Sequence, residues 1–99
     1  MCGIVSTINH SDEVVVDMLQ QIEHRGKDNR GIYESGNVHL GHNRLSINDV
    51  SEAGNQPFVF DDYALVVNGE IWNYPQLRKE YEERGYTFFS NSDSEIILY

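Results

Sequence analysis

Cysteine and basic residues are scarce in this chain of 99 residues. Its one cysteine, Cys2, cannot form an internal disulfide. Seven lysines and arginines stand against 16 acidic residues, so the net charge is −9 and no basic stripe is available for a phosphate backbone. Apolar runs are too short to cross a bilayer, and the first residues show no signal-peptide pattern. We therefore expect no nucleic-acid partner, no membrane association and a cytoplasmic location.

The apolar and turn-forming residues that are present predict an α+β chain of short strands and two clear helices. Helical spacing of apolar residues follows Ser11 and should end at Gly26, and a second helix should run from Pro75 to Gly85. Alternating residues predict strands at 3–8, around 32–33, 38–45, 58–60, 63–67 and 87–89. Ser92 to Glu95 has the spacing of a capping box at the start of a further helix. No repeat or linker divides the chain, which indicates one unit.

Cys2 has a second chemical feature if Met1 is removed. The residue then carries a thiol and a free α-amine, which titrates near pH ~8 and can accept the thiol proton. The thiolate is the attacking species. Judged from its position alone, Cys2 could equally be a small residue at a frayed chain end with no chemical role.

Four clusters of polar residues and glycines are not required by packing: 24–31, 41–47, 68–73 and 92–95. Each has an ordinary interpretation when taken alone. Asn68-Gly69 is typical of a turn, Arg44 of a surface charge and Asp93 of a helix start. The order of the four clusters after Cys2 is what distinguishes the chain.

In this order the motifs resemble the glutaminase domain of class II glutamine amidotransferases, which use an N-terminal nucleophile, and the closest branch is the glutamine-hydrolysing asparagine synthetases. The matching pieces are Cys2-Gly3-Ile4, His24-Arg25-Gly26 with Asp28 and Gly31, Gly41-His42 with Arg44-Leu45-Ser46-Ile47, Gln56-Pro57, Asn68-Gly69-Glu70-Ile71 with Asn73-Tyr74, and Asp93-Ser94-Glu95-Ile96. The resemblance implies a partial Ntn-hydrolase αββα sandwich, with antiparallel sheets flanked by helices. Residues 1–99 would be the N-terminal part of a type-2 glutaminase domain.

The resemblance also implies catalytic roles for three residues. Cys2 would attack the side-chain amide of glutamine, and its own α-amine would accept the proton and return it to the leaving ammonia. The Asn68 side-chain amide and the Gly69 backbone N–H would donate hydrogen bonds to the oxyanion. His10, His39 and His42 receive no catalytic role.

Substrate-binding roles follow from the same resemblance. Arg44 offers a planar fork that suits the α-carboxylate of glutamine. Asp93, together with Glu70, would face the α-ammonium group. Backbone groups of Ile47 and Asn48 would complete the pocket, to which Asn68 and Gly69 also contribute. No metal ligands are expected.

The chain departs from the family pattern in two respects. Lys27 stands where the family usually has proline, in the loop from His24 to Gly31 that we interpret as support for the pocket. The family's glutaminase domain is about twice as long, and the synthetase domain that usually follows is absent from this sequence. We therefore expect no cofactor on this chain, because ATP and Mg²⁺ would belong to that synthetase domain.

Three hypotheses remain open at this point. The chain hydrolyses glutamine and releases ammonia, provided that Met1 is removed and the fold is completed. Alternatively, it is a non-catalytic, truncated fragment that binds glutamine or pairs with a partner chain, either a synthetase polypeptide or a second copy. In the third hypothesis it is a small structural or interaction protein in which the clusters only shape turns.

Overall fold

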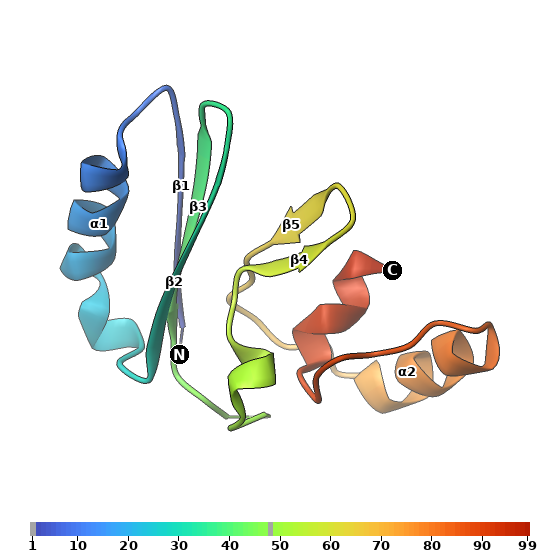
Figure 1. Ribbon diagram of the computed structural model, residues 1–99. Helices are drawn as coiled ribbons and strands as arrows, with labels where there is room; N and C mark the ends of the chain where they lie inside the picture. Colours follow the sequence, from blue (N-terminus) through green and yellow to red (C-terminus); the bar gives the residue numbers. More distant parts are fainter. Residues whose placement is uncertain (1, 48) are drawn as a thin grey trace.

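The computed structural model describes residues 2–47 and 49–99 and has two packed parts (Figure 1). The first is a three-stranded sheet with helix α1 on one face, and the second contains a two-stranded hairpin, helix α2 and the 3₁₀ helix η3. Both sheets are antiparallel. The predicted α+β class with antiparallel sheets and helices is thus confirmed.

The three-stranded sheet has the order β1-β3-β2, with β3 (Val38–Arg44) in the centre. Strand β1 (Gly3–Ile8) and strand β2 (Asn29–Ser35) pair with it on either side, and Val5, Gly41 and Ile32 share one rung. The turn between β2 and β3 lies at Gly36-Asn37. Local alternation therefore predicted where these three strands lie in the sequence, and the structure adds their order in the sheet.

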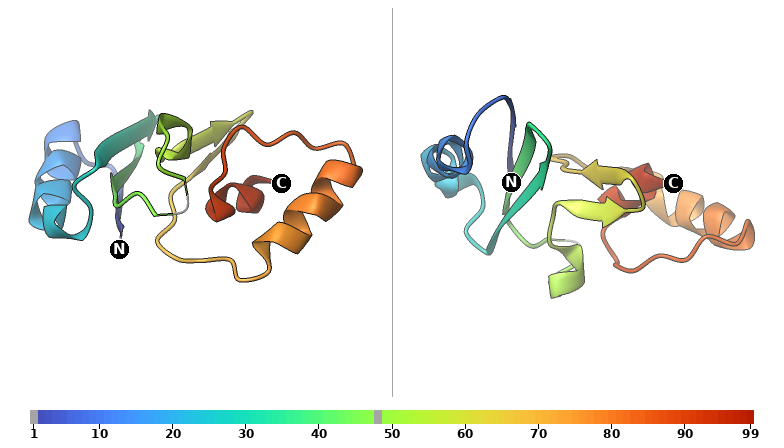
Figure 2. Two further views of the ribbon diagram at one scale, coloured as in Figure 1. Left: turned by 90° about the horizontal axis from the view of Figure 1, so that it is seen from below. Right: turned by 45° about the horizontal axis from the view of Figure 1, so that its top comes forward.

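Helix α1 (Asp12–Gln21) covers one face of the sheet, as the views in Figures 1 and 2 show. Its Val15 and Leu19 are wholly buried and form a small core with Val5 of β1. Burial of such aliphatic side chains contributes about 1.5–3 kcal/mol each. The opposite face of the sheet leaves Ile4 and Ile8 exposed at 46% and 61%.

The second part is built around aromatic contacts. This part consists of the hairpin of β4 (Phe58–Phe60) and β5 (Tyr63–Leu65), the helix α2 (Tyr74–Glu83) and the helix η3 (Asp93–Leu98). Tyr99 is the hub, with its ring 5.4 Å from Phe60 and 5.0 Å from Phe88 between centroids. Burial is the main cause that raises the pKa of Tyr99 to about 12, and its hydroxyl donates to Glu95.

Helix α2 follows its sequence signals closely. Pro75 lies in the first turn, and Arg78 with Glu82 and Arg84 with Glu80, each four positions apart, form ion pairs. Gly85 follows the helix with a φ of +100°, a conformation that suits glycine. Among the described residues, no helix is long and apolar enough to cross a membrane.

Two local predictions were wrong. Helix α1 ends at Gln21, and a short 3₁₀ turn, η1 (Glu23–Arg25), separates it from Gly26, whose backbone is extended. Residues 87–89 form no strand, because their aromatic rings pack against Phe58 and Tyr99 instead of pairing in a ladder.

The capping prediction was half right. Ser92 Oγ accepts from Ser94 N at 3.3 Å and so caps η3. The carboxylate of Glu95 does not complete the box, because it accepts from the backbone N–H groups of Phe89 and Ser90. Glu95 is wholly buried, so these bonds satisfy a charge that would otherwise be costly there.

Candidate active site

A cavity of about 430 Å³ lies where the two parts meet. Its walls come from the chain start, the end of β3 with the following loop, the segment after β5 and the start of η3. Every predicted site residue within the described ranges contributes to this lining: Cys2, Arg44, Ile47, Asn68, Gly69, Glu70 and Asp93. Asn48 lies outside the described residues. The structure brings the residues together, and their chemical roles remain predictions.

Cys2 is held against the end of β3. Its sulfur accepts from Leu45 N at 3.4 Å and lies 3.6 Å from Leu45 O, to which the thiol can donate. Its carbonyl oxygen accepts from Arg25 Nε at 2.9 Å. Both contacts fix the residue just before β1, so the thiol lies at the cavity wall.

Arg44 is the only arginine or lysine in the cavity wall among the described residues. The side chain is 6% exposed, and its Nη1 donates to Ser51 O at 2.6 Å and to Asn55 Oδ1 at 2.8 Å. Nε and Nη2 form the other edge of the planar fork. A guanidinium held in this way can offer that edge to a carboxylate in bidentate geometry.

Gly54 determines how closely the chain approaches this guanidinium. A Cβ at Gly54 would lie 2.3 Å from Arg44 Nη2 and 2.9 Å from Arg44 Cζ. Because Nη1 of Arg44 is bonded to Ser51 and Asn55, the guanidinium could not move away without losing these bonds. Glycine at this position is therefore required by the packing of Arg44.

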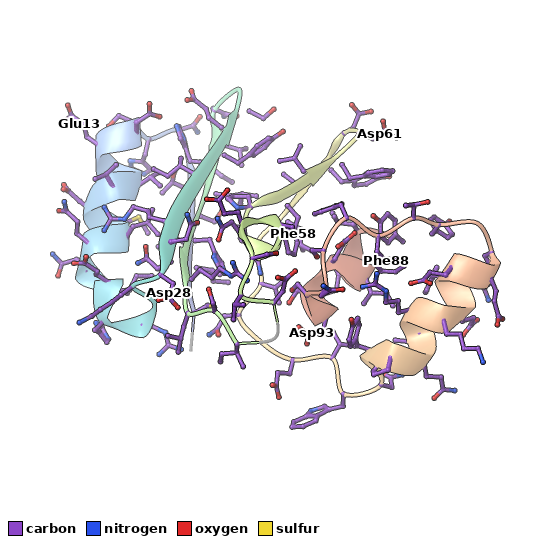
Figure 3. All side chains as sticks on the ribbon, turned by 60° about the horizontal axis from the view of Figure 1, so that its bottom comes forward. Glu13, Asp28, Phe58, Asp61, Phe88 and Asp93 are labelled. Atoms are coloured by element: carbon purple, nitrogen blue, oxygen red, sulfur yellow. The ribbon has the colours of Figure 1, made fainter. Side chains whose placement is uncertain are left out.

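Asp93 supplies a buried carboxylate at the start of η3, where Figure 3 labels it. It is 5% exposed, and its Oδ2 accepts from Ile71 N at 2.7 Å. This bond ties η3 to the segment that follows Gly69 and Glu70. Arg44 and Asp93 thus place opposite charges in one cavity wall.

Asn68 and Gly69 form an exposed bend after β5. No atom would lie within 4 Å of a Cβ built on Gly69, so the backbone there faces open space. Trp72, a little further along, also lines the cavity and is 89% exposed. The bend therefore has room for a ligand beside it.

The loop from His24 to Gly31 lies beneath the site. The backbone N–H of Asp28 donates to Arg44 O at 2.8 Å, and Asp28 Oδ2 accepts from Ser46 N at 2.7 Å. Together with the hydrogen bond from Arg25 to Cys2, these bonds connect the loop to Cys2 and to residues 44–46 beside the cavity. Lys27 is exposed and makes none of them.

Asp49, a buried residue of the cavity wall, was not among the site residues expected from the sequence. Its Oδ1 accepts from Ser51 N at 2.8 Å and its Oδ2 from Asn91 N at 2.7 Å. Asp49 therefore joins the loop that carries the partners of Arg44 to the segment that precedes Asp93. Nothing local distinguishes Asp49 from other loop aspartates, because its partner Asn91 lies 42 positions away.

Replacing Asp49 by asparagine should cost about 2 kcal/mol of stability at neutral pH, since hydrogen bonds to a charged group are lost. The bonds from Ser51 and Asn91 and the charge of Arg44 lower the pKa of Asp49 below 3.8. An aspartate with a depressed folded-state pKa stabilises the fold above its unfolded pKa, and this contribution is lost as pH falls below about 4. Urea unfolding at pH 7 and pH 3 should show a smaller difference between wild type and Asp49→Asn at pH 3. An equal difference at both values would contradict the assignment.

One group of potential metal ligands is present among the described residues, away from this cavity: Asp12, Glu34 and His39. His39 Nε2 lies 2.6 Å from Asp12 Oδ1, so a hydrogen bond accounts for their approach. The cavity itself combines a thiol, a guanidinium, carboxylates and backbone donors. Such a set can hold a zwitterion by its two charges and present a third group to the sulfur.

Comparison with known proteins agrees with this set of groups. The family model described as a glutamine amidotransferase domain matches residues 1–99. The chain is 43% identical over 108 residues to asparagine synthetase [glutamine-hydrolyzing] 1 of Bacillus subtilis (strain 168), which covers 99% of this chain and 17% of that protein. It is 42% identical over 106 residues to asparagine synthetase B [glutamine-hydrolyzing] of Escherichia coli (strain K12), with 99% and 19% covered.

A plant relative gives the same result. Asparagine synthetase [glutamine-hydrolyzing] 1 of Arabidopsis thaliana is 36% identical over 107 residues, which cover 100% of this chain and 18% of the relative. The chain thus spans less than a fifth of the length of these curated relatives. The resemblance inferred from the motifs is confirmed over the whole chain, which belongs to the glutamine amidotransferase domain family.

Proposed function

We propose that this chain carries the glutamine-hydrolysing site of an asparagine synthetase-like protein, with Cys2 as the nucleophile. The observation that carries the proposal is that Cys2, Arg44, Asp93 and the Asn68-Gly69 bend line one cavity. Its volume of about 430 Å³ lies within the ordinary range for small-molecule sites, about 300–1,000 Å³. The relatives are named as glutamine-hydrolysing, which supports glutamine as the substrate.

Recognition of glutamine uses the two charges in the cavity wall. The Nε and Nη2 edge of Arg44 binds the α-carboxylate, and Asp93, assisted by Glu70, faces the α-ammonium group. Backbone groups of Ile47 and Asn48 complete the proposed pocket. Because the two charged ends of the amino acid are fixed, its side-chain amide is directed toward Cys2.

Hydrolysis then proceeds through a thioester. The α-amine of processed Cys2 takes the thiol proton, and the thiolate adds to the amide carbon. Asn68 Nδ2 and Gly69 N–H stabilise the negative oxygen of the tetrahedral intermediate. The α-ammonium returns the proton to the amide nitrogen, the C–N bond breaks and ammonia leaves. Water hydrolyses the thioester to glutamate and restores the thiol.

The proposal extends to the fold and its context. The two antiparallel sheets and their helices are compatible with the first part of an Ntn-hydrolase sandwich, and residues 1–99 would be the N-terminal part of a type-2 glutaminase domain. ATP and Mg²⁺ would act on a separate synthetase domain. We propose a cytoplasmic location and a synthetase polypeptide, or a second copy of the chain, as the protein partner.

Ammonia release is the direct test. The chain, freed of Met1 and checked by intact mass, should release ammonia and glutamate from glutamine in equal amounts. Cys2→Ala should reduce the rate to background, because no nucleophile remains. The same chain with Met1 retained should also be inactive, since its Cys2 nitrogen is an amide and cannot act as a base. Equal ammonia release by wild type and Cys2→Ala would remove the catalytic claim.

The alternative is a non-catalytic fragment that binds glutamine or pairs with another chain. The exposed Ile4 and Ile8 on the open face of the sheet favour it, because such apolar surface is normally covered. Calorimetry with Cys2→Ala separates the two functions: glutamine binding without ammonia release by the processed wild type supports the alternative.

A further inference from the structure

We propose that His42 and Gln56 are positioning residues that hold the Val67 backbone from both sides and so set the direction of the Asn68-Gly69 donors. This inference rests on the proposed function and deepens it. His42 has no catalytic role among those expected from the sequence, and Gln56 is known from there only as part of the Gln56-Pro57 motif. Neither is a catalytic residue in our account, because they act through Val67.

The geometry around Val67 carries the inference. Its backbone N–H donates to Gln56 Oε1 at 2.7 Å, and its carbonyl oxygen lies 3.2 Å from His42 Nε2. Strand β5 ends at Leu65, so Val67 lies beyond the ladder of the hairpin. The two side chains therefore supply the bonds that a sheet partner would otherwise make.

The position of Val67 in the chain explains how this affects the donors. Its carbonyl oxygen shares a rigid peptide plane with the N–H and Cα of Asn68. Fixing that oxygen fixes the plane, and only φ and ψ of Asn68 then separate it from the peptide that carries the Gly69 N–H. The contact with His42 thus restrains the start of the bend immediately before the proposed oxyanion site.

His42 is suited to act as a donor of fixed direction. A carbonyl oxygen only accepts, so Nε2 must carry the proton in this contact. Burial, which is complete for this side chain, lowers the pKa of His42 below 6.5. The bond to Val67 opposes this shift without cancelling it, and the nearby charge of Arg44 adds to it. The ring is therefore neutral at pH 7, with a bare Nδ1 that has no hydrogen-bond partner among the described residues.

Both positioning residues are anchored on the three-stranded sheet. His42 lies on central strand β3, in one rung with Ile4 and Gly31. Gln56 is 7% exposed and lies over the same rung, because a Cβ on Gly31 would lie 2.0 Å from its carbonyl oxygen. The sheet that holds Cys2 and Arg44 thereby also holds the segment leading to Asn68.

Paired substitutions at Gln56 test the inference. Gln56→Met keeps the length of the side chain and loses the acceptor, whereas Gln56→Glu keeps an acceptor oxygen for Val67 N–H. We expect Gln56→Met to lower kcat for ammonia release by about a hundredfold, the cost of misplacing reacting groups by about 1 Å. KM for glutamine should stay within about twofold, since Arg44 and Asp93 remain. Gln56→Glu should recover most of kcat.

His42 offers the matched pair. His42→Leu removes the donor, and His42→Gln places an amide N–H at the reach of Nε2. The first should lower kcat in the same way and the second should restore it. His10→Leu is the control, because this histidine is exposed and lies outside the cavity wall.

Amide exchange by NMR gives a readout independent of activity. Val67 N–H should exchange at least about tenfold faster in Gln56→Met than in wild type, and the Gly69 amide signal should shift in both Gln56→Met and His42→Leu. Unchanged Val67 and Gly69 amides would overturn the inference, as would variants that raise KM and leave kcat intact. An inactive processed wild type with these NMR effects would instead refute the proposed function and leave the Val67 contacts established.

Discussion

Arg44→Ala should raise KM for glutamine by about a hundredfold in the processed chain. The guanidinium is the one basic side chain that the described residues place in the cavity wall, and its Nε and Nη2 edge faces away from its tethers at Ser51 and Asn55. Losing hydrogen bonds to a charged ligand group costs about 1.5–3 kcal/mol, which is about tenfold to more than a hundredfold in affinity. Steady-state ammonia release at varied glutamine concentrations measures KM for each variant.

Two further variants separate charge from geometry. Arg44→Lys keeps the charge but has no planar fork, so it should recover only a small part of the affinity. Arg84→Ala is the matched control, because Arg84 forms an exposed ion pair with Glu80 on α2, away from the cavity. Thermal unfolding of all three variants must be measured as well, since Arg44→Ala also leaves Ser51 O and Asn55 Oδ1 without their donor. Unchanged KM in a folded Arg44→Ala variant would exclude this residue from glutamine binding.

Gly31→Ala should destabilise the fold by about 3 kcal/mol, at the upper end of the usual overpacking range. The added Cβ would lie 2.0 Å from the carbonyl oxygen of Gln56 and 2.9 Å from Pro57 Cδ. The first contact is with backbone, so no side-chain rotation relieves it. A loss of this size is a large fraction of the 5–15 kcal/mol that stabilises a typical domain.

Urea unfolding followed by circular dichroism measures this loss. Tryptophan fluorescence is a poor probe, because the single tryptophan, Trp72, is already 89% exposed in the folded chain. Gly69→Ala is the stability control, since a Cβ there would meet no atom within 4 Å. If Gly31→Ala unfolded at the same urea concentration as wild type, the contact between β2 and Gln56 would not hold in solution.

Elements with local signals were predictable from the sequence. Strand β1 was expected at 3–8 and is observed as Gly3–Ile8. Helix α2 was expected from Pro75 to Gly85 and is observed as Tyr74–Glu83. Their alternation, ion pairs and terminal residues act over a few positions. The prediction for 87–89 failed because long-range packing of aromatic rings overrode the local β-propensity.

The candidate site was also predictable only in part. The motif resemblance pointed to Cys2, Arg44 and Asp93, and these residues line one cavity. It did not reveal Asp49 or the contacts of His42 and Gln56 with Val67. Each of those contacts joins residues at least 11 positions apart, and no pattern in one sequence gives their distance.

By itself, the sequence of this protein determined the local elements, the acidic character and, through motif order, membership of its family. Those properties depend on residue types and short spacings. Only the tertiary structure decided that the two parts meet around a cavity, that Arg44 is held through Nη1 of its guanidinium and that Val67 is bound from both sides. These features depend on close packing between segments far apart in the chain, where a shift of about 1 Å changes which atoms can bond.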